Sequence, residues 1–363
     1  MNELERKLAR IRTFMAQKEV DALLLESAGS FAWATCGASS YINTAATNGL
    51  GSVLITQDHH YILTTNIEAP RIGDEEGTRA QGWEVVGEPW HVAGTKLADL
   101  TAGLRVGADS ARPDAVNLAA DVARLRVNLS PEEVSRFQEL GQICAAAMDE
   151  AIRSIKPGMS EYEIAGTLAQ STEKRGAQPI VNLIATDERI FRFRHPLPTA
   201  KTMDAYAMLV LCGRRQGLVA SITRLVHFGA LSDELQRKMD ATATVDAAFL
   251  SATRPGATLG QVVQAAQEAY AATGFADEWM LHHQGGPAAF EPREYLGVPG
   301  STDTVQANQV YAWNPSITGT KSEDTILIGE TENSVLTTIA GWPMIDSSVN
   351  GQTLARPAIL VVD

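Results

Sequence analysis

The sequence predicts an α/β protein of two domains, the second of which contains an internal repeat with pseudo-two-fold symmetry. Its 363 residues exceed the roughly 250–300 residues at which a single hydrophobic core stops growing. Stretches with the apolar spacing of amphipathic helices alternate with short apolar runs typical of strands. A Pro-Gly turn followed by a Ser or Thr helix cap occurs twice, at residues 155–160 and 253–258. These observations predict a first domain at residues 1–127 and a second at residues 128–363.

The first domain is expected to begin with a helix and to continue as a small α/β unit. Residues 3–18 have apolar side chains at helical spacing, which predicts an amphipathic helix. Buried strands are expected at residues 20–25, 51–56 and 60–64, where apolar residues run together. The polar segment at residues 38–50 is expected to be a loop.

A helix start marks the beginning of the second domain. Ser130 suits a helix N-cap, Pro131 suits the first helical position and Glu133 completes a capping box. Apolar residues then recur at helical spacing as far as Ile152, which predicts a long amphipathic helix.

The repeated motif predicts how the second domain is built. In each copy a Pro-Gly turn ends one helix, and Ser160 or Thr258 caps the next helix. Two similar α/β halves are expected to enclose a cleft, where ligands commonly bind.

The composition disfavours several classes of partner. A net charge of -13 argues against nucleic acid and anionic membranes, because both reward basic patches. Apolar runs stay shorter than the ~20 residues that a membrane-spanning helix requires, and the charged N-terminus lacks the pattern of a signal peptide. We therefore expect a cytoplasmic protein with neither a nucleic-acid nor a membrane partner.

Four stretches, taken in order, resemble landmarks of one enzyme family. They are MAQKEVDALLLESAGSFAWATCG at 15–37, IKPGMSEYEIAGTL at 155–168, GLVASITRLVHFG at 217–229 and KSEDTILI at 321–328. Their order and spacing resemble the creatinase, aminopeptidase P and prolidase family over almost the whole chain. The resemblance implies a small creatinase-like first domain followed by a catalytic domain of the pita-bread fold.

The resemblance also implies a metal site that has lost most of its ligands. Peptidases of this family hold two metal ions with two aspartates, a histidine and two glutamates, since bridging carboxylates neutralise neighbouring cations. The positions of three of the four carboxylates carry other side chains here: Val210, Leu211 or Cys212 at the first, Ser221 at the second and Asn314 at the third. His282 and Glu323 keep a side chain that can bind metal. We therefore expect neither a metal ion nor a cofactor, with weak binding of a single ion as the alternative.

Two residues are the candidates for catalysis. Creatinase uses a histidine as acid and base in place of a metal, and the segment FRHPLPTAKT places His195 at the similar position. Glu323 is the second candidate, because a carboxylate can orient substrate or hold the histidine in its working tautomer. The structural alternatives are that His195 caps a hairpin and that Glu323 forms a salt bridge with Lys321 or an arginine.

Four further residues are candidates for substrate binding. Arg293 lies where creatinase has an arginine that holds the substrate carboxylate, and a guanidinium suits that group. His282 matches the metal-binding histidine of the peptidases, although its neighbour His283 is an alternative for the residue that faces the cleft. Thr223 and Asn314 are expected at the cleft as well. The aromatic residues Tyr311 and Trp313 either line the pocket or pack in the core.

Three functions remain open from the sequence. The first is a metal-independent hydrolase that cleaves a C–N bond, of the amide or amidine-like type, in a small carboxylate-bearing compound. The second is a lyase or another proton-transfer enzyme acting on a small acid in the same pocket. The third is a binding protein that has kept the cleft and lost catalysis. The resemblance further implies a homodimer in which residues 38–50 of one chain reach the cleft of the other.

Overall fold

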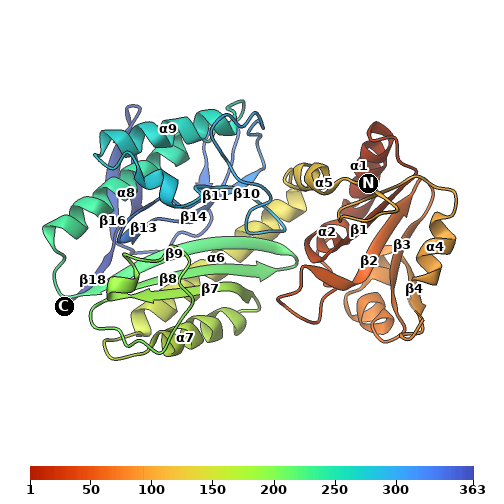
Figure 1. Cartoon of the computed structure of the whole chain (residues 1–363), viewed down its shortest axis with the longest axis horizontal. Helices are drawn as coiled ribbons and strands as arrows, with labels where there is room; N and C mark the ends of the chain where they lie inside the picture. The colour runs from red at the N-terminus through yellow and green to blue at the C-terminus, as the bar shows by residue number, and fades with distance from the viewer. Residues whose placement is uncertain (93) are drawn as a thin grey trace. The chain divides into compact units, whose positions relative to one another are not determined.

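The computed structural model describes residues 1–92 and 94–363, and it separates into two compact units (Figure 1). Unit 1 contains residues 1–133 and 216–218, and unit 2 contains residues 134–215 and 219–363. The predicted domain boundary after residue 127 lies between helix α5 (Ala119–Arg126) and helix α6 (Pro131–Ser154). Both units mix helices with strands, so the predicted α/β class is confirmed.

Unit 1 is built around a six-stranded mixed sheet with the order β4-β3-β2-β1-β5-β6. The strands are β1 (Ala22–Ser27), β2 (Asn48–Thr56), β3 (His60–Thr65), β4 (Glu84–Glu88), β5 (Val106–Ala108) and β6 (Val116–Asn117). The helical segments are α1 (Glu3–Gln17), α2 (Ala28–Ala34), η1 (Arg71–Glu75), α3 (Thr78–Gln81), α4 (Thr95–Thr101) and α5. Strand β1 has β2 as an antiparallel neighbour and β5 as a parallel one. The central position of β1 explains why its aliphatic residues form an unbroken run.

Most of the elements predicted in this unit agree with the structure, and one needs a correction. The predicted loop at residues 38–50 ends at residue 47, because strand β2 already begins at Asn48, which pairs with Ser27. The sequence NGL resembles a turn when it is considered alone, but here the pairing of Asn48 with Ser27 of β1 makes it the start of the strand.

Unit 2 contains two four-stranded sheets with the orders β18-β9-β8-β7 and β10-β11-β14-β15. Its strands are β7 (Gln178–Thr186), β8 (Tyr206–Arg215), β9 (Leu218–Phe228), β10 (Gly285–Ala288), β11 (Val310–Trp313), β12 (Ser316–Ile317), β13 (Thr320–Lys321), β14 (Asp324–Leu327), β15 (Ser334–Val335), β16 (Met344–Val349), β17 (Gln352–Pro357) and β18 (Leu360–Val362). Its helices are α6, α7 (Glu161–Glu173), α8 (Asp233–Ala252) and α9 (Leu259–Ala272), with short 3-10 turns η2 (Asp187–Arg189) and η3 (Glu278–Leu281). Helices α6 and α7 lie on one side of the strands, and α8 and α9 lie on the other (Figure 1).

The repeated sequence motif has the same local structure in both copies. Ser160 opens α7 and Thr258 opens α9, each through a capping box. The glycines before them, Gly158 and Gly256, both adopt a φ of 90°, a conformation that favours glycine. Both cap residues also form isolated antiparallel bridges: Ser160 with Thr202, and Thr258 with Thr304. The two halves of unit 2 therefore begin in the same way.

Removing either cap should have a similar effect on stability. In each capping box the Ser or Thr side chain accepts a backbone N–H that would otherwise lack a partner. We expect Ser160→Ala and Thr258→Ala each to lower the free energy of unfolding by about 1 kcal/mol in urea denaturation. Thr244→Ala, a change at a partly exposed position inside α8, should stay within about 0.5 kcal/mol of the unaltered chain. Equal effects of all three changes would contradict the capping argument.

Buried ion pairs connect strand β14 to three other elements of unit 2. Asp324 pairs with Arg224 of β9 and with Arg356 of β17, at 2.8 and 2.7 Å. Arg356 also pairs with Asp246 of α8 at 2.7 Å. The two arginine side chains are only 3% and 2% exposed. These buried ion pairs therefore hold β14, β9, β17 and α8 together.

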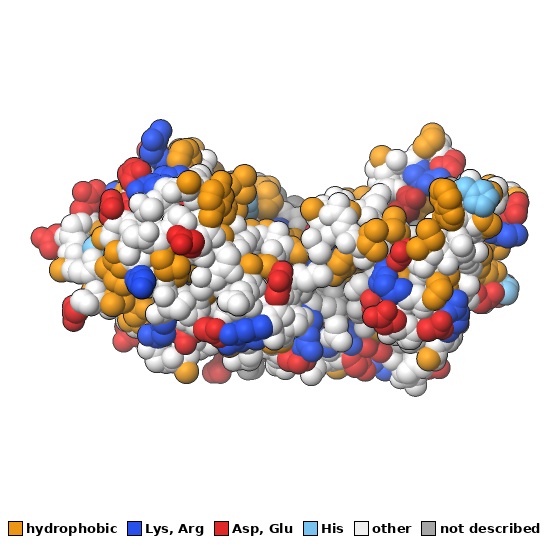
Figure 2. Space-filling model, turned by 90° about the horizontal axis from the view of Figure 1, so that it is seen from below, with side chains coloured by type: hydrophobic (Ala, Val, Ile, Leu, Met, Phe, Trp, Pro, Cys, Tyr) orange, Lys and Arg blue, Asp and Glu red, His pale blue; other side chains and the backbone are white. Residues whose placement is uncertain are grey.

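The surface carries charges of both signs. On the face shown in Figure 2, Lys and Arg side chains lie interspersed with Asp and Glu side chains. Within the part of the chain that the structure describes, no helix has the length and apolar character needed to cross a membrane.

Candidate active site

A cavity of about 510 Å³ in unit 2 combines an apolar wall with a wall of polar and charged groups. The apolar wall includes Val181, Leu183, Val210 and Leu296. The polar wall includes His195, His283, Arg293, Asn314, Lys321 and Glu323. The volume lies within the range typical of small-molecule sites.

The apolar wall follows from strand geometry. Val181 and Leu183 are two residues apart on β7, and their side chains therefore share one face of the sheet. In the antiparallel neighbour β8, Cys212 lies opposite Val181 and Val210 lies opposite Leu183. The alternation also explains why Val210 and Cys212 line the cavity, whereas Leu211 between them does not.

Glu323 lines the cavity, and both of its carboxylate oxygens have partners. Oε1 accepts a hydrogen bond from Arg293 Nη2 at 2.8 Å. Oε2 accepts one from Thr223 Oγ1 at 2.6 Å and pairs with Lys321 Nζ at 2.9 Å. Burial acts to raise the pKa of Glu323, but the charges of Lys321 and Arg293 outweigh it and hold the pKa well below its usual value. Glu323 is therefore an anion that already has two cationic partners.

Lys321 is the site residue that the sequence analysis missed. The side chain is only 5% exposed and lines the cavity, whereas the sequence suggested it only as a possible ion-pair partner. The signal that could have found it is spacing, because Lys321 and Glu323 are two residues apart in extended backbone and so face the same side.

Three histidines gather at one end of the polar wall. The Nε2 atoms of His195 and His282 lie 3.0 Å apart, and the ring of His283 stacks on that of His282 with centroids 4.5 Å apart. His195 and His283 line the cavity, while His282 is buried and contacts His195. Of the two adjacent histidines, His283 therefore faces the cavity.

The pKa values of the three histidines lie below the ordinary value for histidine, which favours the neutral form at pH 7. Burial, followed by the charge of Lys321, lowers the pKa of His282 to about 2. Burial, followed by the charge of Arg293, lowers the pKa of His283 to about 4. For His195, burial and then Lys321 again lower the pKa below 6.5. Neutral imidazoles can accept protons, which is what general base catalysis requires.

The loop that carries His195 is anchored on both sides of it. The fully buried Glu161 accepts hydrogen bonds from Thr199 Oγ1 at 2.7 Å and from Thr186 N at 2.9 Å, and it pairs with Arg189. Arg194, next to the histidine, donates to Glu278 Oε2 at 2.8 Å. These contacts fix the backbone of the loop and so the position of the His195 imidazole.

The remaining predicted residues have distinct places. Asn314 lines the cavity, and its buried Oδ1 has no hydrogen-bond partner among the residues that the structure describes. Thr223 is buried behind Glu323 and is not among the cavity-lining residues. Tyr311 and Trp313 pack in the core, where the Trp313 ring stacks on Phe249; the core alternative therefore holds for both.

The donor set does not fit a pair of metal ions. Ser221 Oγ accepts from Arg293 Nη1 at 3.1 Å, and it lies 3.3 Å from Cys212 Sγ. Burial raises the pKa of Cys212 to about 11, so the thiol stays neutral. The two cations on Glu323 occupy the oxygens that a metal would need. With one carboxylate and two fixed cations, the cavity cannot neutralise two divalent ions.

The three histidines alone have the spacing of a ligand set for one ion. Their ligand nitrogens all lie within 4.8 Å of one another, and neutral imidazoles suit transition metals. The charges of Lys321 and Arg293, which help to lower the pKa values of these imidazoles, would repel a dication in the same way.

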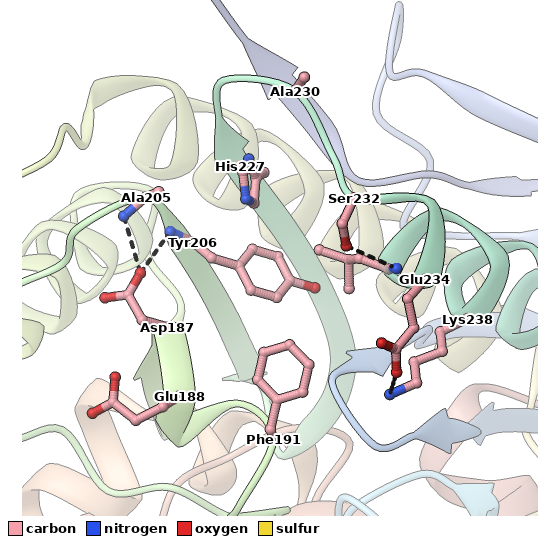
Figure 3. A pocket seen from close by; sticks show the side chains of 11 residues that line it. Asp187, Glu188, Phe191, Ala205, Tyr206, His227, Ala230, Ser232, Glu234 and Lys238 are labelled. Carbon is pink, nitrogen blue, oxygen red and sulfur yellow. Dashed lines mark hydrogen bonds and ion pairs between the residues drawn. The ribbon is translucent and has the colours of Figure 1, made fainter.

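A second cavity, of about 660 Å³, lies beside the start of α8 (Figure 3). Its charged side chains are already paired. Asp187 Oδ1 accepts from the backbone N–H groups of Ala205 and Tyr206, at 2.9 and 3.0 Å, and Glu234 pairs with Lys238 at 2.9 Å. These groups stabilise the local backbone and helix, so the smaller cavity with the histidines is the better candidate for an active site.

Comparisons with known proteins agree with this fold. The model of the metallopeptidase family M24 matches residues 135–330. The uncharacterized peptidase YqhT of Bacillus subtilis is 24% identical over 91% of this chain and 97% of its own length. A Xaa-Pro dipeptidase of Pyrococcus horikoshii is 22% identical over 93% of this chain and 98% of its own. The solved structure of a Xaa-Pro dipeptidase from Bacillus anthracis superimposes with a TM-score of 0.79 at 19% identity, covering 99% of this chain and 100% of that one. The chain therefore belongs to the metallopeptidase family M24, which confirms the predicted relationship to creatinase, aminopeptidase P and prolidase and the predicted pita-bread fold.

Proposed function

We propose that this member of a hydrolase family works without metal and cleaves a C–N bond, of the amide or amidine-like type, in a small compound that carries a carboxylate. One observation carries the proposal. Glu323, at the position of a metal-binding glutamate in the peptidases, is held on both oxygens by Lys321, Arg293 and Thr223. Fixed cations thus take the place that metal ions have in the relatives.

His195 is the proposed general acid and base. Its neutral imidazole accepts a proton from a water molecule whose oxygen attacks the carbon of the C–N bond. The imidazolium then returns that proton to the nitrogen as the C–N bond breaks, so the histidine ends the cycle in its starting state. His282, with its Nε2 atom 3.0 Å from that of His195, orients the ring.

The remaining polar groups suit a small substrate with hydrogen-bonding and anionic parts. Arg293 lines the cavity, and its buried Nε–H has no hydrogen-bond partner among residues 1–92 and 94–363. Asn314 also lines the cavity, and a side-chain amide can donate to or accept from a polar group of the substrate.

Metal analysis of the purified protein tests the central claim. After incubation with Mn²⁺, Co²⁺ or Zn²⁺ and removal of free ions, we expect less than one bound ion per chain by mass spectrometry. Turnover of a panel of N-acyl and N-carbamoyl amino acids should be unchanged by a chelator, because no step uses a metal.

Three outcomes would contradict the proposal. Two bound ions per chain would indicate a metal-dependent enzyme like the peptidases of the family. Loss of turnover with the chelator would indicate the same. One tightly bound ion that is lost in His283→Ala would assign the three histidines to a metal site instead.

A further inference from the structure

We infer that Lys321 sets the charge of the substrate, because with Arg293 it gives the cavity one uncompensated positive charge and so selects a ligand with one net negative charge. This inference rests on the proposed function and adds to it a residue and a substrate class. It assigns to Lys321 a specificity role that goes beyond its ion pair with Glu323.

The ammonium group of Lys321 has bonding capacity left for a ligand. Its Nζ pairs with Glu323 Oε2 at 2.9 Å, and an ammonium group has three N–H donors. Within the part of the chain that the structure describes, no other acceptor bonds to this ammonium group. A lysine whose side chain is 5% exposed and lies at the wall of a cavity can direct the other N–H groups at a bound acceptor.

The charges of the cavity-lining residues sum to plus one. Lys321 and Arg293 each contribute one positive charge, and Glu323 contributes one negative charge. His195 and His283 are neutral at pH 7, because burial and the nearby cations lower the pKa of each. A ligand with one negative charge therefore makes the occupied cavity neutral.

The same balance holds during the proposed reaction. When water attacks, the oxygen or nitrogen that is doubly bonded to the attacked carbon gains one negative charge, and His195 gains one positive charge. The sum within the cavity stays at zero, and Lys321 can bind the newly negative atom. Val181, Leu183 and Val210 also line the cavity, and these apolar side chains strengthen such interactions because they lower the local dielectric constant.

Binding of two matched probes tests the inference without any turnover. N-acetylglycine carries one negative charge, and N-acetylglycinamide has nearly the same shape without it. By calorimetric titration of the full chain at pH 7, we expect the anion to bind at least about tenfold more tightly. Lys321→Met should reduce this ratio by at least about tenfold, whereas Lys321→Arg should keep most of it.

The controls separate this inference from the proposed function. Lys238→Met removes a lysine of the second cavity and should bind both probes as the unaltered chain does. Lys321→Met is expected to fold, because Glu323 keeps Arg293 and Thr223 as partners, and thermal denaturation checks this.

Equal affinity of the unaltered chain for both probes, or no measurable binding of N-acetylglycine, would overturn the inference without any variant. A charge preference that depends on Lys321 in a protein that hydrolyses nothing would support the inference and count against the proposed function.

Discussion

Replacing Asp324 with alanine should lower the free energy of unfolding by about 3–5 kcal/mol, because the change leaves the buried Arg224 without a carboxylate partner and the buried Arg356 with Asp246 alone. Asp324 Oδ1 accepts from Arg224 Nη2 at 2.8 Å and from Thr337 Oγ1 at 2.6 Å. Its Oδ2 accepts from Arg356 Nη2 at 2.7 Å. Water cannot replace these contacts easily, since the arginine side chains are only 3% and 2% exposed. Urea denaturation followed by circular dichroism measures the loss.

Two comparisons show whether charge is the cause. Asp324→Asn keeps the shape and removes the charge, so it should retain most of the loss. Asp149→Ala removes a partly exposed pair with Arg153 at 2.6 Å, and it should cost about 0–1 kcal/mol. A loss below about 1 kcal/mol for Asp324→Ala would mean that the arginines find other partners, and the cluster would then not hold the sheets together.

Local signals in the sequence were sufficient for much of the fold. The first helix was expected at residues 3–18 and is α1 (Glu3–Gln17), which begins with a capping box at Asn2. The helix start at Ser130 is also correct, with Glu133 Oε2 accepting the Ser130 N–H at 2.7 Å. Caps depend on residues three positions apart, so a linear reading can find them. The start of β2 could not be found in this way, because its first residues are fixed by pairing with distant parts of the chain.

The site residues that could be predicted are those at positions that the resemblance to the family assigns to the site. His195, Arg293, Asn314 and Glu323 were named from the resemblance, and all four line one cavity. The role of Lys321 was not found, because a lysine beside a glutamate in the sequence is usually a solvated surface charge. Whether such a residue is 5% exposed depends on the strands that cover it, which the local sequence does not specify.

Replacing His195 with glutamine should reduce kcat by about 10²–10⁴-fold on any amide that the chain hydrolyses, since glutamine cannot take up and return a proton. For the unaltered chain, the rate should rise with pH as His195 loses its proton and should be level by pH 7. The midpoint of this rise should lie below pH 6.5, because burial and the charge of Lys321 both lower the pKa of His195, with Arg293 adding to and Glu323 opposing this effect. Steady-state kinetics between pH 4 and 8 measures both effects.

The result for His195→Gln must be separated from a general loss of structure. His59→Gln alters an exposed histidine that pairs with Glu84 in unit 1, and it should leave kcat unchanged. Lys321→Met should move the midpoint of the pH profile upwards, because it removes a positive charge that opposes protonation of His195. A general acid and base at this position requires both results together: a large loss of kcat without His195, and a pH profile that responds to the charge beside it. If His195→Gln keeps kcat within a few-fold of the unaltered chain, proton transfer must use another group, and His283, the other neutral imidazole that lines the cavity, would be the next residue to test.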